Sequence, residues 1–496
     1  MGVVKKQGIR ESIVAYFGVI IGAVSLLIIQ PYCLEPQQIG IIKIIIALAS
    51  LMTPFVVLGM NASMIKFFPE FNNPDEKHYG LISFVLTVPI IGFILLAILF
   101  FSFQGALVDY YSSKNENNLV GDYIGYALPL ALCMAYILIM KDISRSMLNV
   151  VVPSIVQNVW LRIGTIIIVV LYFYGIITFT TLIGCVVGIY GISVMIMLLY
   201  IRHLGMLHLA PDRRFFKKEK LKEVGNYAFY VVFIGVSGYV VNFIDILMIG
   251  ASQGEGQAGI YTIAFFIGTV IEIPRRSLSS ITSPLVAQAF NDGNITKVKY
   301  LYSNVSINLL IVGSILLIGI WSNIDNLFML MPNGEIYAAG KYVVLLIGLA
   351  KLFNMSTSIN GEIISLSPHF RFNMYAMVLL AGLTVGTNIY FIPKYGILGA
   401  AVASLIAVVT FNLVKLIYLW LKLKMQPFNL ATVKVLVLSA FVIFINYLIP
   451  YMELPLLDII IRSILLGGIY VGLLLATKIS PDINGIVVNV WNRVKG

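Results

Sequence analysis

The sequence predicts an all-α membrane protein with about 14 transmembrane helices, arranged as two parallel six-helix lobes and two additional C-terminal helices. Three observations support this class: the composition, the spacing of apolar segments and an internal repeat. The chain has 496 residues, of which 59% are hydrophobic and 11% are charged. Its mean hydropathy is +0.96. Soluble domains carry about 25% charged residues, so this composition is typical of a multi-pass membrane protein.

Fourteen segments are long enough to cross a membrane, which requires about 20 apolar residues per helix. Pro, Gly, Asn and charged residues occupy the gaps between them, as expected for short loops. The first six segments are residues 11–31, 39–67, 81–103, 122–147, 153–174 and 178–201. The next six are residues 224–250, 258–289, 299–321, 337–366, 372–392 and 397–421. The last two are residues 430–450 and 455–477.

The basic residues of the loops predict the orientation. With the N-terminus placed in the cytoplasm, twenty-three Lys and Arg residues lie in inner loops, and only Lys114, Lys341 and Lys394 lie in outer loops. This asymmetry predicts a cytoplasmic membrane protein with both termini inside. It also explains the net charge of +11 without nucleic acid as a partner. A missed or invented pair of helices would keep the alternation, so twelve helices remain an alternative.

Several short motifs occur twice in the same order. Gln38-Ile39-Gly40-Ile41 returns as Gln257-Ala258-Gly259-Ile260. At nearly the same spacing, Pro54 returns as Pro274, Phe71-Asn72 as Phe290-Asn291, and Tyr174-Gly175 as Tyr395-Gly396. Because both copies begin inside, we expect parallel lobes around a shared cleft, which is typical of transporters. The predicted parts are a lobe at 1–202, a basic cytoplasmic linker at 203–223, a lobe at 224–422, two additional helices at 430–477 and a cytoplasmic tail at 478–496.

The eighth segment carries charges deep in the membrane. It contains Glu272, Pro274, Arg275 and Arg276, and Ser279, Thr282 and Ser283 follow on the same helical face as Glu272 and the arginines. An ionisable residue in a membrane span costs about 2.5–3.5 kcal/mol, so such residues usually face a cavity. We expect Pro274 to kink the helix. One Glu272 carboxylate cannot neutralise two arginines, and guanidinium groups match phosphate oxygens. Arg275 and Arg276 are therefore predicted to bind an anion.

Other spans add charges to this prediction. The tenth segment, residues 337–366 (helix 10), carries a polar stripe that we expect on one face of a continuous helix: Lys351, Asn354, Ser358, Glu362 and Ser365. Arg162 lies near mid-membrane, whereas Lys43 and Asp245 lie nearer the outer surface and Lys415 can extend to the cytoplasmic surface. Arg462 is a further intramembrane cation. We predict a positive cavity between the lobes, in which Arg162, Lys43 and Lys351 join the two arginines. Asp245, Glu272 and Glu362 are the candidates for proton coupling or for simple charge balance.

The sequence offers no catalytic or metal site. Cys33, Cys133 and Cys185 are far apart, and all four His residues fall in predicted cytoplasmic loops. No metalloprotease, nucleophile-elbow or phosphate-loop motif is present. We therefore expect a transporter that uses no cofactor.

Two motifs resemble those of a known family. Asp245-Ile246-Leu247-Met248-Ile249-Gly250, with Ala258-Gly259-Ile260-Tyr261-Thr262-Ile263-Ala264, is similar to the helix 7–8 signature of Wzx-type polysaccharide or O-antigen unit flippases. Pro393-Lys394-Tyr395-Gly396-Ile397-Leu398-Gly399-Ala400-Ala401-Val402-Ala403 is similar to their helix 11–12 signature. This family is a member of the multidrug/oligosaccharidyl-lipid/polysaccharide exporter superfamily. The similarity in pattern extends over nearly the whole chain.

The resemblance implies a V-shaped pair of bundles that works by alternating access. It implies that undecaprenyl-diphosphate-linked oligosaccharide moves from the cytoplasmic to the periplasmic leaflet, for lipopolysaccharide O-antigen or capsule synthesis. Membrane lipids, a polysaccharide polymerase and glycosyltransferases are the implied partners.

Two alternatives were weighed against this interpretation. A cation-coupled multidrug exporter of the same superfamily usually keeps a membrane-embedded acid in its first lobe, but here helix 1 has only Glu11 and helix 2 carries Lys43. An organic cation would also favour acids and aromatic residues in its site. A membrane polysaccharide polymerase or acyltransferase would need a larger outer loop with catalytic residues than residues 104–121 provide.

Overall fold

The computed structural model describes residues 2–71, 80–112, 119–207, 218–369 and 371–479, and every regular element in these ranges is helical. Within them, thirteen helices are long and apolar enough to span a membrane. One of these, Arg371–Leu423, changes direction at Gly396, whose combination of φ 57° and ψ −134° is favourable only for glycine. It thus contains two of the predicted spans, 372–392 and 397–421. The predicted class, an all-α membrane protein with about 14 helices, is confirmed.

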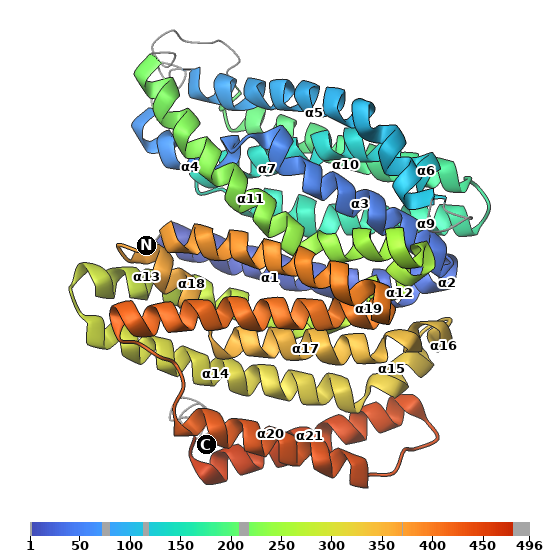
Figure 1. Cartoon of the computed structure of the whole chain (residues 1–496), viewed down its shortest axis with the longest axis vertical. Helices are drawn as coiled ribbons and strands as arrows, with labels where there is room; N and C mark the ends of the chain where they lie inside the picture. The colour runs from blue at the N-terminus through green and yellow to red at the C-terminus, as the bar shows by residue number, and fades with distance from the viewer. Residues whose placement is uncertain (1, 72–79, 113–118, 208–217, 370, 480–496) are drawn as a thin grey trace. The chain divides into compact units, whose positions relative to one another are not determined.

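The chain divides into two compact units, residues 1–259 and 260–496 (Figure 1). The first unit is built from α1 (Gly2–Val24), η1 (Ser25–Ile29), α2 (Gln30–Cys33), α3 (Pro36–Val57), α4 (Met60–Phe71), α5 (Leu81–Ser112), α6 (Val120–Tyr123), η3 (Ile124–Tyr126), α7 (Ala127–Ser146), α8 (Val151–Ile155), η4 (Val156–Trp160), α9 (Leu161–Phe173), α10 (Phe179–His203) and α11 (Lys218–Gln253). Helix α12 (Glu255–Thr269) starts in the first unit and continues into the second.

The second unit contains the remaining elements. They are η5 (Val270–Glu272), α13 (Ile273–Asn291), α14 (Ile295–Ser322), α15 (Ile324–Leu330), α16 (Gly334–Tyr337), η6 (Ala338–Gly340), α17 (Lys341–Ser356), α18 (Asn360–Leu366), α19 (Arg371–Leu423), α20 (Leu430–Leu448) and α21 (Pro455–Thr477).

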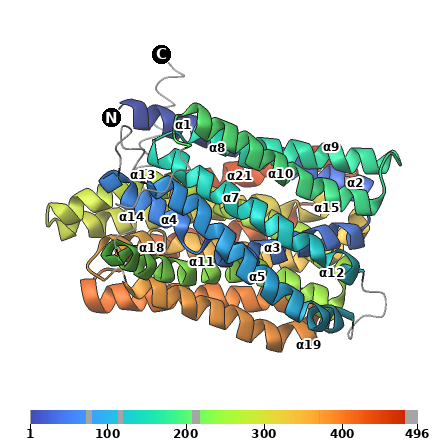
Figure 2. The same cartoon turned by 90° about the horizontal axis from the view of Figure 1, so that it is seen from above.

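In the first unit, α4, α5 and α7 lie side by side (Figure 2). Helix α11 begins at Lys218, so residues 218–223 of the predicted linker 203–223 are helical. Lys220 forms ion pairs with Glu70 at 2.6 Å and Glu223 at 2.9 Å, and its amine lies over the Phe67 ring. These contacts attach the start of α11 to the end of α4. Residues 208–217 of the linker and 480–496 of the predicted tail lie outside the described residues.

The two repeated motifs make reciprocal contacts where α3 and α12 begin. A Cβ atom on Gly40 would lie 1.8 Å from the carbonyl oxygen of Glu255, and one on Gly259 would lie 2.1 Å from the carbonyl oxygen of Pro36. Pro36 and Glu255 occupy equivalent positions in the repeat, as do Gly40 and Gly259. The two copies of the motif thus contact one another through the same pair of positions, within the first unit.

Replacing either glycine of this contact by alanine is expected to destabilise the protein. A methyl group would collide with backbone that belongs to another helix start, and such overpacking typically costs about 1–3 kcal/mol. We expect Gly40→Ala and Gly259→Ala to lower the thermal unfolding temperature of the detergent-solubilised protein. Gly256→Ala is the matched control, because its Cβ would make an ordinary contact at 3.5 Å with Gln37. Equal unfolding temperatures for all three variants would contradict the importance of the reciprocal contact.

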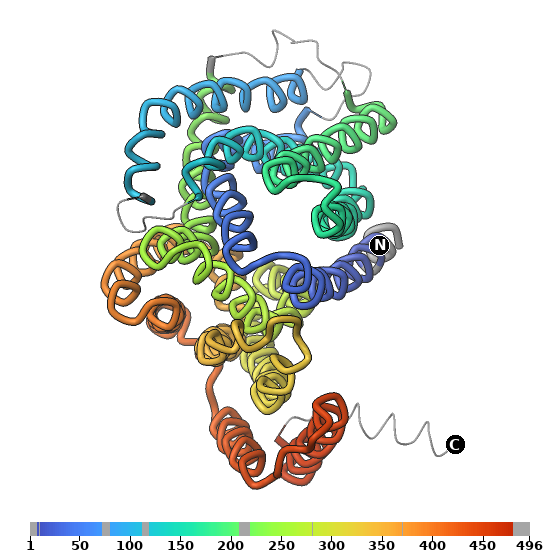
Figure 3. Tube along the Cα trace, turned by 90° about the vertical axis from the view of Figure 1, so that its right-hand side faces the viewer, coloured from blue at the N-terminus to red at the C-terminus, as the bar shows by residue number. Residues whose placement is uncertain are grey.

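Helices α20 and α21 form a hairpin that packs against α14 in the second unit (Figure 3). Val435, Val442, Leu466 and Leu474 are buried in the core that they share with α14. The Tyr470 hydroxyl donates a hydrogen bond of 3.3 Å to the carbonyl oxygen of Ile311. The two helices outside the repeat are therefore an integral part of this unit.

A fully buried ion pair ties α21 to its surroundings. Arg462 and Asp458 are each 1% exposed, and the Arg462 Nε and Nη2 atoms lie 3.0 and 3.1 Å from the two Asp458 oxygens. Arg462 Nη1 donates to the Asn446 side chain at 2.9 Å, and Nη2 donates to the Pro450 carbonyl at 3.1 Å. Asn326 of α15 donates to the same Asp458 carboxylate. These bonds satisfy the intramembrane cation within the protein, which indicates a structural role.

Candidate anion-binding site

Two breaks in the helices build a polar site inside the second unit. Helix α12 ends at Thr269, the 3₁₀ turn Val270–Glu272 follows, and α13 begins at Ile273 with Pro274 in its first turn. Proline is tolerated there because the first N–H groups of a helix have no internal acceptor. The sequence predicts a kink at Pro274. The helix is indeed interrupted there, but the interruption is the turn Val270–Glu272 directly before Pro274, and a new helix begins at Ile273. It leaves Glu272 beside the first turn of α13.

The second break corrects the prediction for helix 10. Helix α17 ends at Ser356, Ser358 has a φ of 55°, and α18 begins at Asn360. Lys351 and Glu362 therefore lie on two short helices and not on one continuous face. Proline is absent from this turn, and the apolar periodicity of the segment gave no sign of the interruption.

The Glu272 carboxylate is held by three side chains, a group that we call the clamp: Arg275, Lys351 and Asn354. Glu272 Oε1 accepts hydrogen bonds from Arg275 Nη1 at 3.1 Å and from Asn354 Nδ2 at 2.6 Å. Glu272 Oε2 lies 2.9 Å from Lys351 Nζ. The Glu272, Arg275 and Lys351 side chains are 15%, 22% and 19% exposed, so these charges are largely shielded from solvent. Two cations and an amide around one carboxylate form a donor set suited to any oxyanion.

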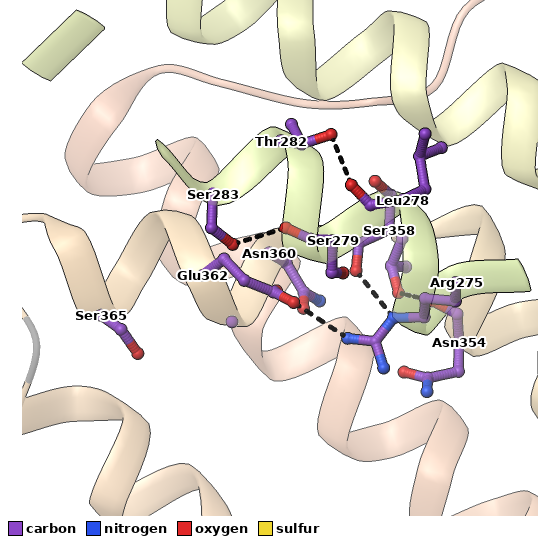
Figure 4. A network of polar contacts seen from close by, with 12 residues as sticks. Arg275, Leu278, Ser279, Thr282, Ser283, Asn354, Ser358, Asn360, Glu362 and Ser365 are labelled. Atoms are coloured by element: carbon purple, nitrogen blue, oxygen red, sulfur yellow. Dashed lines mark hydrogen bonds and ion pairs between the residues drawn. The ribbon is translucent and has the colours of Figure 1, made fainter. Parts of the chain in front are cut away.

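Arg275 also reaches across to the broken helix (Figure 4). Its Nε donates to the Ser358 carbonyl oxygen at 3.2 Å, and its Nη2 lies 3.8 Å from Glu362 Oε1. The Ser358 carbonyl is available because the chain leaves the α-helix at this point. Arg275 thus connects Glu272 with Glu362.

An amide relay behind the clamp was missed by the sequence analysis. Asn412 of α19 donates to the Asn354 side-chain oxygen at 3.1 Å. In turn, its own oxygen accepts from Thr357 and Asn360, each at 3.0 Å. This relay fixes the Asn354 amide so that its N–H points at Glu272. A fully buried asparagine within an apolar span was the signal that could have identified it.

Arg276 lies apart from this network. Consecutive residues are about 100° apart around a helix, and Arg276 is exposed while Arg275 points into the network. Among the described residues Arg276 has no hydrogen-bond or ion-pair partner. The structure thus brings together Arg275, Lys351, Glu272 and Glu362, and leaves out the second predicted arginine.

The prediction that Lys415 extends to the cytoplasmic surface is wrong. Lys415 is only 6% exposed. Its amine lies 4.0 Å from the centre of the Phe411 ring and 3.1 Å from where a Cβ on Gly361 would sit. The helix α18 packs over α19 and covers the lysine. Lys415 therefore places its amine in the interior of this unit.

The remaining predicted residues lie in the first unit. Arg162 of α9 reaches α1, where its Nη1 donates to the Gly18 carbonyl oxygen, and a Cβ on Gly22 would collide with its guanidinium. Lys43 of α3 is half-buried, and Asp245 of α11 is 2% exposed. Within the described residues, neither Lys43 nor Arg162 forms an ion pair with a carboxylate. The first unit thus holds two cations whose charge is not balanced by a carboxylate contact.

Comparison with solved structures identifies the fold. A lipid II flippase, MurJ, in an inward closed conformation superposes with a TM-score of 0.75 at 16% sequence identity, covering 95% of this chain and 100% of that one. An inward-facing multidrug resistance transporter of the MATE family superposes with a TM-score of 0.60 at 12% identity, covering 83% of this chain and 94% of that one. A superfamily member from Pyrococcus furiosus, described as having a binding pocket of reverse polarity, gives 0.57 at 13% identity, with 85% and 96% covered. The chain has the fold of this exporter superfamily.

The family follows from the sequence. The model of the polysaccharide biosynthesis protein family matches residues 5–290, more than half of the chain. The chain therefore belongs to the polysaccharide biosynthesis protein family, as the resemblance of its helix signatures predicts. No curated protein sequence matches it significantly.

Proposed function

We propose that this protein is a flippase for undecaprenyl-diphosphate-linked oligosaccharide. The observation that carries the proposal is the clamp, which already holds an oxyanion: both Glu272 oxygens are bound by side chains from α13 and α17. A phosphate offers similar oxygens and more negative charge, so the same donors suit a diphosphate. Because the chain belongs to a polysaccharide biosynthesis family, we propose that the bound anion is the diphosphate of a lipid-linked sugar.

In the proposed mechanism, the diphosphate displaces the Glu272 carboxylate from Arg275 and Lys351. Glu272 is thus an internal competitor that occupies both cations while substrate is absent. Protonation of Glu272 or Glu362 would release the cations, so these acids are the proposed link to a proton gradient, and Asp245 is the third candidate. Lys43 and Arg162 are proposed anion-binding residues of the first unit, since neither pairs with a carboxylate among the residues that the structure describes.

The direction of transport follows from the predicted topology. The substrate is loaded at the cytoplasmic leaflet and released at the periplasmic leaflet by alternating access, while the lipid tail stays in the bilayer. Glycosyltransferases would supply the substrate and a polysaccharide polymerase would consume it. The protein carries out transport and no bond chemistry in this proposal.

Deletion of the gene is expected to leave lipid-linked oligosaccharide on the cytoplasmic leaflet, because synthesis continues while translocation stops. The measurement is the fraction of lipid-linked sugar that an external glycosidase or lectin can reach in spheroplasts, compared between the deletion strain and the complemented strain. Equal access in both strains would contradict the proposal. Equal access with increased sensitivity to cationic drugs would instead favour the multidrug exporter.

A further inference from the structure

A cavity of about 400 Å³ opens beside the clamp, entirely within the second unit. Its lining residues come from α13, α18 and α19: Ser283, Gly361, Glu362, Ser365, Leu366 and Asn373. The Ser283 hydroxyl donates to the Ser279 carbonyl oxygen at 2.8 Å, and the Glu362 carboxylate points toward Arg275 (Figure 4). Glu362 lines the cavity, and its Oε1 atom lies 3.8 Å from Arg275 Nη2. The cavity therefore adjoins the clamp through the Glu362 side chain.

Two hydrogen-bond acceptors in the residues that line this cavity receive no hydrogen bond from the described residues. Asn373 Nδ2 donates to the Gly361 carbonyl at 3.0 Å and to Ser365 Oγ at 2.6 Å, so both of its donors are used. Asn373 Oδ1 and Glu362 Oε2 are covered atoms that receive no hydrogen bond. Leaving such covered atoms without a donor is unfavourable. A ligand that brings hydroxyl or amide donors would remove this cost after a small side-chain rotation.

The charges around the cavity disfavour a metal cation as that ligand. Arg275 approaches Glu362 from one side, and the buried Lys415 amine lies against Gly361 in the cavity wall. The Arg275 guanidinium already neighbours the single carboxylate, and like charges repel strongly where water is excluded. A neutral group with several hydroxyls fits both the acceptors and the charge.

We infer that this cavity binds the first sugar of the lipid-linked substrate. The inference rests on the proposed function. In a lipid-linked saccharide the first sugar is bonded directly to the terminal phosphate. With the diphosphate on Arg275 and Lys351, that sugar lies beside Arg275, where the cavity opens. Ligand pockets typically measure about 300–1,000 Å³, so the cavity has room for a monosaccharide. Ser283, Ser365, Asn373 and Glu362 are the residues that would contact it.

Filling the cavity tests the inference. The purified protein in lipid nanodiscs is titrated with two probes: undecaprenyl diphosphate, and the lipid-linked oligosaccharide extracted from the deletion strain. We expect Ser283→Leu to weaken binding of the glycosylated probe about tenfold or more, the equivalent of losing two or three hydrogen bonds. Binding of undecaprenyl diphosphate should change less than about twofold, because the clamp is untouched. Ser365→Leu should give the same pattern.

Gln288→Leu, an exposed position on the same helix, is the matched control and should leave both affinities unchanged. Retained binding of undecaprenyl diphosphate shows that each variant is folded. Equal weakening of both probes, or no weakening of either, would overturn the sugar site and leave the proposed function standing. The sugar site would also be overturned, in favour of a cation site, by two results together: the wild type binds sodium and Ser283→Leu does not, and the wild type binds the glycosylated probe no more tightly than undecaprenyl diphosphate. Failure of the wild type to bind either probe would overturn the proposed function itself.

Discussion

Arg275→Ala is expected to lower substrate export about 100-fold. Arg275 contacts both Glu272 and Glu362, and its guanidinium can give a phosphate two parallel hydrogen bonds. Two charge-assisted bonds of about 1.5 kcal/mol each correspond to about two orders of magnitude in affinity. The measurement is the rate at which surface polysaccharide appears after induction in the complemented deletion strain, normalised to protein level in the membrane.

Three further variants separate substrate binding from stability. Arg275→Lys keeps the charge but loses the planar fork, so we expect an intermediate rate. Arg276→Ala should have a smaller effect than Arg275→Ala, because Arg276 stands outside the network. The double variant Arg275→Ala with Glu362→Gln removes the carboxylate that loses its ion-pair partner, and should recover protein level without recovering export. Normal export by a well-expressed Arg275→Ala protein would refute the clamp as the diphosphate site.

Arg462→Met is expected to destabilise the protein by about 3–5 kcal/mol, the cost of leaving a buried charge without its partner. Asp458 is 1% exposed, and after the substitution its carboxylate would keep only uncharged hydrogen-bond donors, the Asn326 side chain and the Met452 backbone. Because the hairpin of α20 and α21 packs on α14, the loss should spread through the second unit. The measurement is thermal unfolding in detergent, together with the amount of protein in the membrane.

The double variant Arg462→Met with Asp458→Asn should recover most of the lost stability, since no unpaired charge then remains. Lys434→Met is the matched control, because Lys434 is an exposed residue of α20. It should unfold at the wild-type temperature. An Arg462→Met protein as stable as the wild type would show that the buried pair contributes nothing to the packing of the hairpin.

Intramembrane position alone did not separate structural cations from candidate binding cations. Arg462 and Arg275 both lie in apolar spans, yet Arg462 is satisfied by Asp458, Asn446 and nearby carbonyls, whereas Arg275 borders a cavity wall. Asp458 is one helical turn from Arg462 in the sequence, so this pairing was within reach of a sequence-based argument. The burial of Lys415 was not, because the helix that covers it is distant in the sequence.

The sequence by itself determined the membrane class, the number of spans, the parallel repeat and the region of the change in helix geometry near Pro274. Hydropathy, glycine and proline affect the conformation of the residues next to them in the sequence. Their consequences can therefore be deduced without knowing the tertiary contacts. Only the tertiary structure decided which charges meet: Glu272 with Lys351 and Asn354, Arg275 with Glu362, and Lys415 beneath Gly361. These contacts depend on the break at Ser358 and on the rotation of each helix about its axis, which places Arg275 in the network and its neighbour Arg276 outside it.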